Sequence, residues 1–194
     1  MKVTFTKVPG RRYLVAVNRG VGPRLAPRFG PGYDPHLPHD LVHFVVEVEA
    51  GIQDGVFGQL ASGDCGIFWP ADPAERRRAK RRKRRLSEGE SADLARSERL
   101  VAQCHSLWRI RAGQAGEAPA AAPPYGSEGT LVERICARLD DAARQWHALQ
   151  IGAGMTVSWP QPKRRHRPGD AERRSGKPPV RHHPAHRQRY RQGA

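Results

Sequence analysis

The positive charge of this chain is concentrated in two segments, and this distribution limits which residues can build a folded core. The formal net charge is +15 over 194 residues. Residues 71–90 carry nine Lys or Arg and four Asp or Glu, residues 161–194 carry eleven and two, and the rest of the chain is left with a net charge of +1. Segments with so much like charge and so few apolar side chains cannot offset the entropy lost on ordering. We therefore expect one small domain over residues 1–160, with a basic linker at about 71–90, and a disordered basic tail over residues 161–194.

Three short stretches have the side-chain pattern of β-strands. Residues 3–7 alternate apolar and polar side chains, residues 13–17 are rich in β-forming residues, and Pro9 and Gly10 between them signal a turn. Residues 154–159 show the same alternation near the other end of the domain. Because a two-stranded hairpin is marginal by itself, we expect all three to form a small three-stranded antiparallel sheet.

Helical spacing of apolar residues predicts that this sheet packs against three or four helices in an α+β fold. The first helix should follow a Gly- and Pro-rich loop at residues 20–38. It should begin with Pro38 at its first helical position and stop at Gly51. Residues 53–61 suit a second, short helix.

Two longer helices are expected further along the chain, over residues 91–111 and residues 131–150. Ser91 is the expected N-terminal cap of the first, and Thr130 has the spacing of a capping box for the second. The single tryptophan in each helix is expected to anchor the core. An Ala-, Pro- and Gly-rich loop at residues 113–129 should connect them.

The sequence motif most specific to a chemical function lies at the start of the first predicted helix. His39, His43 and Glu47 follow one another at intervals of four, so on a helix they share one stripe. Neutral imidazoles and a carboxylate are suitable ligands for divalent transition metals such as zinc. We therefore expect a metal site with His39, His43 and Glu47 as ligands. Asp40 is the candidate catalytic base or orienting group, and enzymatic activity is left open.

Two other interpretations apply to the same stripe, which could be a solvated helix face or a partner-binding surface. If it does hold a metal, three protein ligands leave one tetrahedral position open for a water or for a ligand from elsewhere. Candidates for that further ligand are Asp34, His36 and His105, and the spacing does not select among them.

Two enzyme families share part of this motif. The spacing of His39 and His43 resembles that of the zincin metalloproteases, in which a Glu general base follows the first His. Here that position is Asp40, which is one methylene shorter, so protease activity is not carried over. His39, Asp40 and His43 also resemble a His-Asp-x-x-His motif of ubiquinone-biosynthesis proteins. In that family a Glu follows twelve residues later, where this chain has Gly55.

The run from Leu37 to Glu47 resembles a family of small uncharacterised bacterial proteins. The resemblance continues through Asp54–Gly58 and extends to the segment Arg134–Leu139. It covers about half of the chain. It brings no assigned activity.

The basic linker supports a second hypothesis, a nucleic-acid-associated accessory protein that binds non-specifically. Cationic side chains neutralise phosphates without reading bases, and Tyr190 in the basic tail could stack on a base. The alternative is a solvated linker followed by an unstructured tail, and no helix-turn-helix, RNA-recognition or zinc-finger signature is present. The candidate phosphate-binding residues are Arg76, Arg77, Arg78, Lys80, Arg81, Arg82, Lys83, Arg84 and Arg85.

The cysteines and the apolar runs indicate where the protein resides. Cys65, Cys104 and Cys136 form no Cys-x-x-Cys pair, and an odd, sparse set of this kind fits a reducing compartment. The N-terminal residues lack the apolar run of a signal peptide, and no run approaches the roughly 18 residues of a membrane helix. We therefore expect a cytoplasmic protein without membrane insertion.

Overall fold

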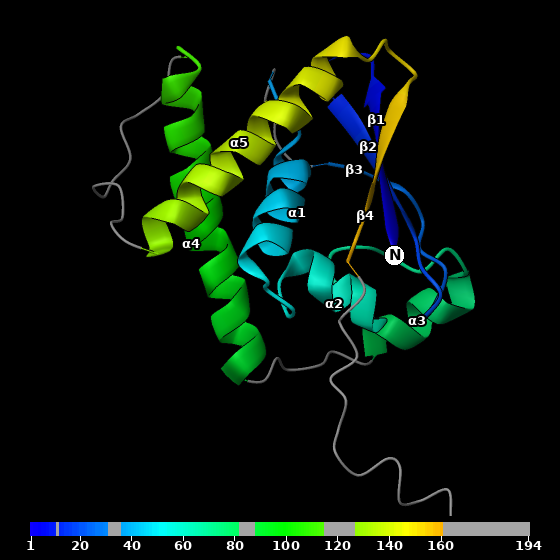
Figure 1. Cartoon of the computed structure of the whole chain (residues 1–194). Helices are drawn as coiled ribbons and strands as arrows, with labels where there is room; N and C mark the ends of the chain where they lie inside the picture. Colours follow the sequence, from blue (N-terminus) through cyan, green and yellow to red (C-terminus); the bar gives the residue numbers. More distant parts are fainter. Residues whose placement is uncertain (11, 31–35, 82–87, 115–126, 161–194) are drawn as a thin grey trace, which may run out of the picture. The chain divides into compact units, whose positions relative to one another are not determined.

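A computed structural model of the protein describes residues 1–10, 12–30, 36–81, 88–114 and 127–160. Residues Met1–Gln161 form one compact unit, and the predicted disordered tail lies outside the described residues. Within these ranges the chain has five helices and one four-stranded antiparallel sheet, an arrangement shown in Figure 1. The elements in chain order are β1 (Lys2–Val8), β2 (Arg12–Asn18), β3 (Arg28–Phe29), α1 (His39–Ala50), α2 (Val56–Ser62), α3 (Pro73–Arg81), α4 (Glu88–Arg111), α5 (Ser127–Ala148) and β4 (Gly154–Ser158).

The sheet has the strand order β3-β2-β1-β4. The predicted N-terminal hairpin is confirmed, with Phe5 of β1 opposite Val15 of β2. The predicted final strand is also confirmed, because β4 pairs with the other edge of β1 and places Met155 opposite Phe5. Phe5 and Val15 are fully buried, so one face of the hairpin packs on the core.

The described residues form five helices instead of three or four, because α3 occupies part of the predicted basic linker. The prediction of three strands is also wrong, because the structure has a fourth. β3 comes from the predicted loop at residues 20–38 and pairs with β2 through Phe29 opposite Leu14. The N–H of Gly30 extends the pairing by donating to the Tyr13 carbonyl at 3.0 Å. A strand of two residues is too short to show the alternation that identifies a strand in a sequence.

Helix α1 ends as predicted and begins one residue later. Gly51 adopts the left-handed conformation, with φ of 65°, and its N–H donates to the carbonyls of Glu47 and Val48. Pro38, predicted at the first helical position, is instead the N-cap, with φ of −56° and ψ of 128°. Its carbonyl accepts the N–H groups of Leu41 and Val42, so proline still starts the helix without needing an N–H of its own.

The two long helices begin earlier than predicted. Helix α4 starts at Glu88 and α5 at Ser127, so the predicted caps Ser91 and Thr130 lie inside helices. In α4 the first turn carries two glutamates, whose negative charge favours a helix N-terminus. The apolar periodicity located both helices, but the Ser and the Thr expected as caps did not mark the first helical residues.

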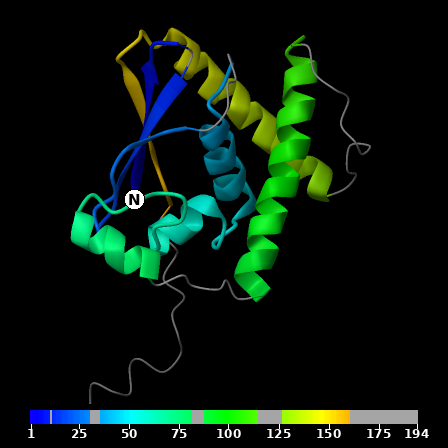
Figure 2. The ribbon, with the colours of Figure 1, turned by 180° about the vertical axis from the view of Figure 1, so that it is seen from behind.

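Helix α1 occupies the centre of the domain. It contacts α2, α4 and α5, and Figures 1 and 2 show it between the sheet and the crossed pair α4 and α5. Trp108 of α4 and Trp146 of α5 are buried, which confirms both as core anchors. None of the described helices is long and apolar enough to cross a membrane.

Candidate functional site

The polar stripe of α1 is buried. The exposed fractions of Asp40, His43 and Glu47 are 3%, 5% and 0%, while His39 is half-buried. Elements on several sides of α1 cover its polar stripe as well as its apolar one. The interpretation as a solvated face is therefore wrong for His43 and Glu47. Each of these groups must find its hydrogen-bond partners inside the protein.

The carboxylate of Glu47 caps the N-terminus of α2. Oε1 accepts the N–H of Val56 at 2.7 Å, and Oε2 accepts the N–H groups of Phe57 at 2.8 Å and Gly58 at 3.4 Å. Free N–H groups at a helix start carry partial positive charge, which suits a carboxylate. Burial raises the pKa of Glu47 above its ordinary value, and these hydrogen bonds, with one from Ser97, oppose the rise. The predicted metal ligand is thus engaged with the backbone of α2.

Ser97 of α4 connects Glu47 to His43. Its hydroxyl donates to Glu47 Oε1 at 2.9 Å, and its Oγ lies 3.4 Å from His43 Nδ1. Because the single hydroxyl proton goes to the carboxylate, Oγ can only accept from His43. Nδ1 of His43 therefore carries the proton, and Nε2 presents its lone pair. Metal-ligating histidines are commonly oriented by a hydrogen-bond acceptor behind the ring in this way.

The lone pair of His43 is directed at His39. The two Nε2 atoms lie 3.2 Å apart, with the rings at 81° to each other. Two imidazole nitrogens at about 2.0–2.1 Å from one tetrahedral zinc ion would themselves lie about 3.3 Å apart. The observed separation therefore suits two states of the pair. In one, His39 donates a hydrogen bond to His43, and in the other both lone pairs converge on a cation.

Glu98 brings a carboxylate to the same place. Its Oε2 lies 3.8 Å from His43 Nε2, and its side chain is 60% exposed. Over the part of the chain that the structure describes, no three His, Cys, Asp or Glu side chains already form a metal-holding group.

The surroundings of His43 favour its neutral form. Burial lowers the pKa of His43 to about 4, and the neighbouring His39 and His105 add to the shift. The His105 ring stands 6.5 Å from that of His39, between centroids, and stacks on Trp108. His36, another candidate for a further ligand, lies against His147 instead. Asp34 falls outside the described residues.

Asp40 is held in an ion pair on the other side of the α1 N-terminus. Its Oδ2 accepts from Arg28 Nη2 at 2.8 Å, and its N–H donates to the hydroxyl of Tyr13 at 3.2 Å. Burial raises the pKa of Asp40, and the charges of Arg28 and His39 oppose the rise. These contacts tie α1 to β2 and β3. A role for Asp40 as a catalytic base stays a prediction.

Four residues of this cluster were not anticipated from the sequence: Tyr13, Arg28, Ser97 and Glu98. A signal for Ser97 was present, because it interrupts the apolar stripe of α4 between Leu94 and Val101 at helical spacing. A buried serine among apolar neighbours usually has a polar partner. No local signal could identify Arg28 or Glu98, whose partners lie on other elements.

The basic block is only partly described. Arg76, Arg77, Arg78, Lys80 and Arg81 belong to α3, a helix without a buried residue. Arg78 is paired with Glu75 at 2.8 Å. The remaining predicted phosphate-binding residues, Arg82, Lys83, Arg84 and Arg85, lie outside the described ranges, as does Tyr190.

Comparison with known proteins adds no assignment to this geometry. No protein-family model matches the chain, and no curated protein or solved structure is significantly similar to it. The resemblance of the Leu37–Glu47 run to small bacterial proteins stays a prediction.

Proposed function

We propose that the protein binds a divalent transition-metal ion, with zinc the first candidate, between His39 and His43. The observation that carries the proposal is the pair of Nε2 atoms that face each other at 3.2 Å. Glu98, at 3.8 Å from His43 Nε2, would be the third ligand. With three protein ligands, one tetrahedral position would remain for water, as in catalytic zinc sites.

In this proposal Glu47 acts on the metal indirectly and is not a ligand. Its carboxylate holds Ser97, and Ser97 fixes the His43 tautomer whose Nε2 can coordinate. The predicted triad on one stripe thus becomes two histidines from α1 and a carboxylate from α4. A ligand set drawn from two elements is held by the packing between them, and α1 and α4 are in contact.

Calorimetric titration of the full-length, chelator-treated protein with Zn²⁺ tests the proposal, and Co²⁺ provides a visible absorption band that reports coordination geometry. We expect one ion per chain at the site. His39→Asn should abolish the tetrahedral Co²⁺ band, because it removes a half-buried ligand without opening a core cavity. Ser97→Ala should weaken metal affinity by about 10- to 100-fold, the usual effect of losing a ligand's hydrogen-bond partner.

His147→Asn is the matched control, because His147 is an exposed histidine of α5. His182, His183 and His186 of the tail are retained in every variant, so any binding by the tail would be common to all of them. If His39→Asn and His147→Asn bind Zn²⁺ and Co²⁺ equally well, the ion is not held by the His39–His43 pair and the proposal is wrong. Selective loss in His39→Asn, with weaker binding in Glu98→Gln, supports the complete ligand set.

A further inference from the structure

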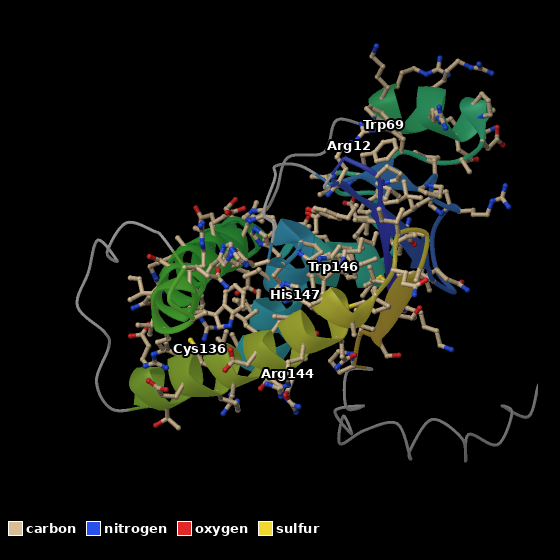
Figure 3. The ribbon with its side chains drawn as sticks, turned by 90° about the horizontal axis from the view of Figure 1, so that it is seen from above. Arg12, Trp69, Cys136, Arg144, Trp146 and His147 are labelled. Atoms are coloured by element: carbon tan, nitrogen blue, oxygen red, sulfur yellow. The ribbon has the colours of Figure 1, made fainter. Side chains whose placement is uncertain are left out.

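Trp69 differs from the other tryptophans of the protein in its exposure. Its side chain is 56% exposed, whereas Trp108, Trp146 and Trp159 are buried. Figure 3 labels Trp69 beside α3, well separated from the labelled Trp146 of the helical core. An exposed indole is the largest apolar group a protein can offer to a ligand, and such groups are enriched in binding surfaces.

The backbone that carries Trp69 is held in place. The Trp69 carbonyl accepts the N–H of Ala26 at 2.8 Å, and the N–H of Ala71 donates to the Arg24 carbonyl at 2.8 Å. The preceding residue, Phe68, is buried in the core. The indole therefore projects from a fixed segment, so a ligand stacking on it would not first have to order the backbone.

Cationic side chains of α3 surround the indole. Trp69, Arg76, Arg77 and Lys80 line a surface hollow of about 290 Å³. Arg76 is anchored through Nε to the Pro70 carbonyl at 2.5 Å. The hollow thus combines one aromatic face with three positive charges, and its volume lies just below the range of about 300–1,000 Å³ that is usual for ligand sites.

We infer that Trp69 and the α3 cations Arg76, Arg77 and Lys80 form a binding surface for single-stranded nucleic acid. A base would stack on the indole while the adjoining phosphates pair with the cations, the combination that single-strand-binding proteins use. Duplex fits less well, because its bases are already stacked and do not present a free face. This site is separate from the proposed metal site in its residues and its chemistry.

An anionic membrane surface is the competing source of negative charge. A membrane-binding helix needs an apolar face to insert below the headgroups. The only apolar side chains in α3 besides Pro73 are Ala74 and Ala79, and the rest are charged. The composition of α3 therefore favours soluble phosphates over a lipid surface.

Binding of the full-length protein to an oligothymidine of about 15 nucleotides, a length that spans one typical site, tests the inference. Because Trp69 is the exposed fluorophore, stacking should quench tryptophan emission on titration. Trp69→Leu should lose the quenching and weaken binding about tenfold, while Trp69→Phe should retain part of the affinity. Each phosphate contact with a single strand contributes about 0.7 to the slope of log affinity against log salt. The triple variant R76A/R77A/K80A removes three such contacts, so it should make that slope shallower by about 2.

The control R96A/R99A/R144A removes the same charge from exposed positions on α4 and α5. Equal losses of affinity in the two triple variants would show general electrostatic attraction and overturn the inference. So would an unchanged affinity and quenching in Trp69→Leu, or duplex binding as tight as single-strand binding. A blue shift of Trp69 emission with anionic vesicles, in the absence of quenching by oligothymidine, would assign the surface to membranes instead.

Discussion

Replacing Gly55 by alanine tests whether the buried carboxylate of Glu47 is fixed where the structure places it. A Cβ on Gly55 would lie 2.4 Å from Cδ and Oε1 of Glu47 and 2.8 Å from Oε2. Gly55 has φ of −72° and ψ of −169°, an extended conformation that alanine adopts without strain. The cost of Gly55→Ala must therefore come from displacing the carboxylate and not from the backbone.

The magnitude follows from the contacts that the carboxylate would leave. Hydrogen bonds to a charged group contribute about 1.5–3 kcal/mol each, and Val56 and Phe57 donate the two shortest from α2, at 2.7 and 2.8 Å. Stranding a buried charge costs about 3–5 kcal/mol. Replacing glycine by alanine also stabilises the folded state by about 0.4–1 kcal/mol, because alanine restricts the conformations of the unfolded chain. We expect Gly55→Ala to lower the free energy of unfolding by about 3 kcal/mol.

Urea denaturation of a double-mutant cycle measures this coupling. The cycle consists of wild type, Gly55→Ala, Glu47→Ala and the double variant. Unfolding of each protein is monitored by the fluorescence of the buried tryptophans. In the Glu47→Ala background the added methyl meets no carboxylate, so Gly55→Ala should cost almost nothing there. Gly20→Ala is the matched control, because a Cβ at Gly20 meets no atom within 4 Å.

Two results would refute the reasoning. One is a Gly55→Ala variant within about 0.5 kcal/mol of wild type, the range of a neutral surface substitution. The other is a cost for Gly55→Ala that is the same with and without Glu47. Either would mean that the carboxylate moves freely and does not hold α2 and Ser97 in place.

Two further predictions concern charges near α1. Because the pKa of His43 falls from 6.5 to about 4 on folding, the unfolded chain takes up a proton between these pH values while the folded chain does not. In the presence of chelator, the free energy of unfolding should therefore fall by up to about 3 kcal/mol as the pH drops from 6.5 to 4. Urea denaturation at several pH values should show that this free energy depends less on pH in His43→Asn than in wild type. The same pH dependence in both proteins would contradict the prediction. Arg28→Ala should cost about 3 kcal/mol by leaving Asp40 buried without its partner. Thermal unfolding should show part of that loss recovered in Arg28→Ala/Asp40→Asn, and no recovery would contradict the ion pair's role.

The helices and strands that local pattern predicts are present, although α4 and α5 begin earlier than expected. The other errors lie where structure depends on distant residues. The hairpin, α1 with its Gly51 stop, and the final strand each follow from alternation or helical spacing within a few residues. Strand β3 has no such pattern, because it exists only through pairing with β2. The apolar stripe of α1 was visible in the sequence, but the depth at which its polar stripe is buried was not.

The sequence alone determined that His39 and His43 would meet, because residues four apart on a helix face the same way whatever surrounds them. It also placed Glu47 on the same stripe. Tertiary structure decided what each one contacts. Helix α4 lies across α1 and brings Ser97 and Glu98 to His43. The Glu47 carboxylate accepts hydrogen bonds from the N-terminus of α2. Spacing sets the direction of a side chain, but only packing between elements sets its burial, its partners and so its chemistry.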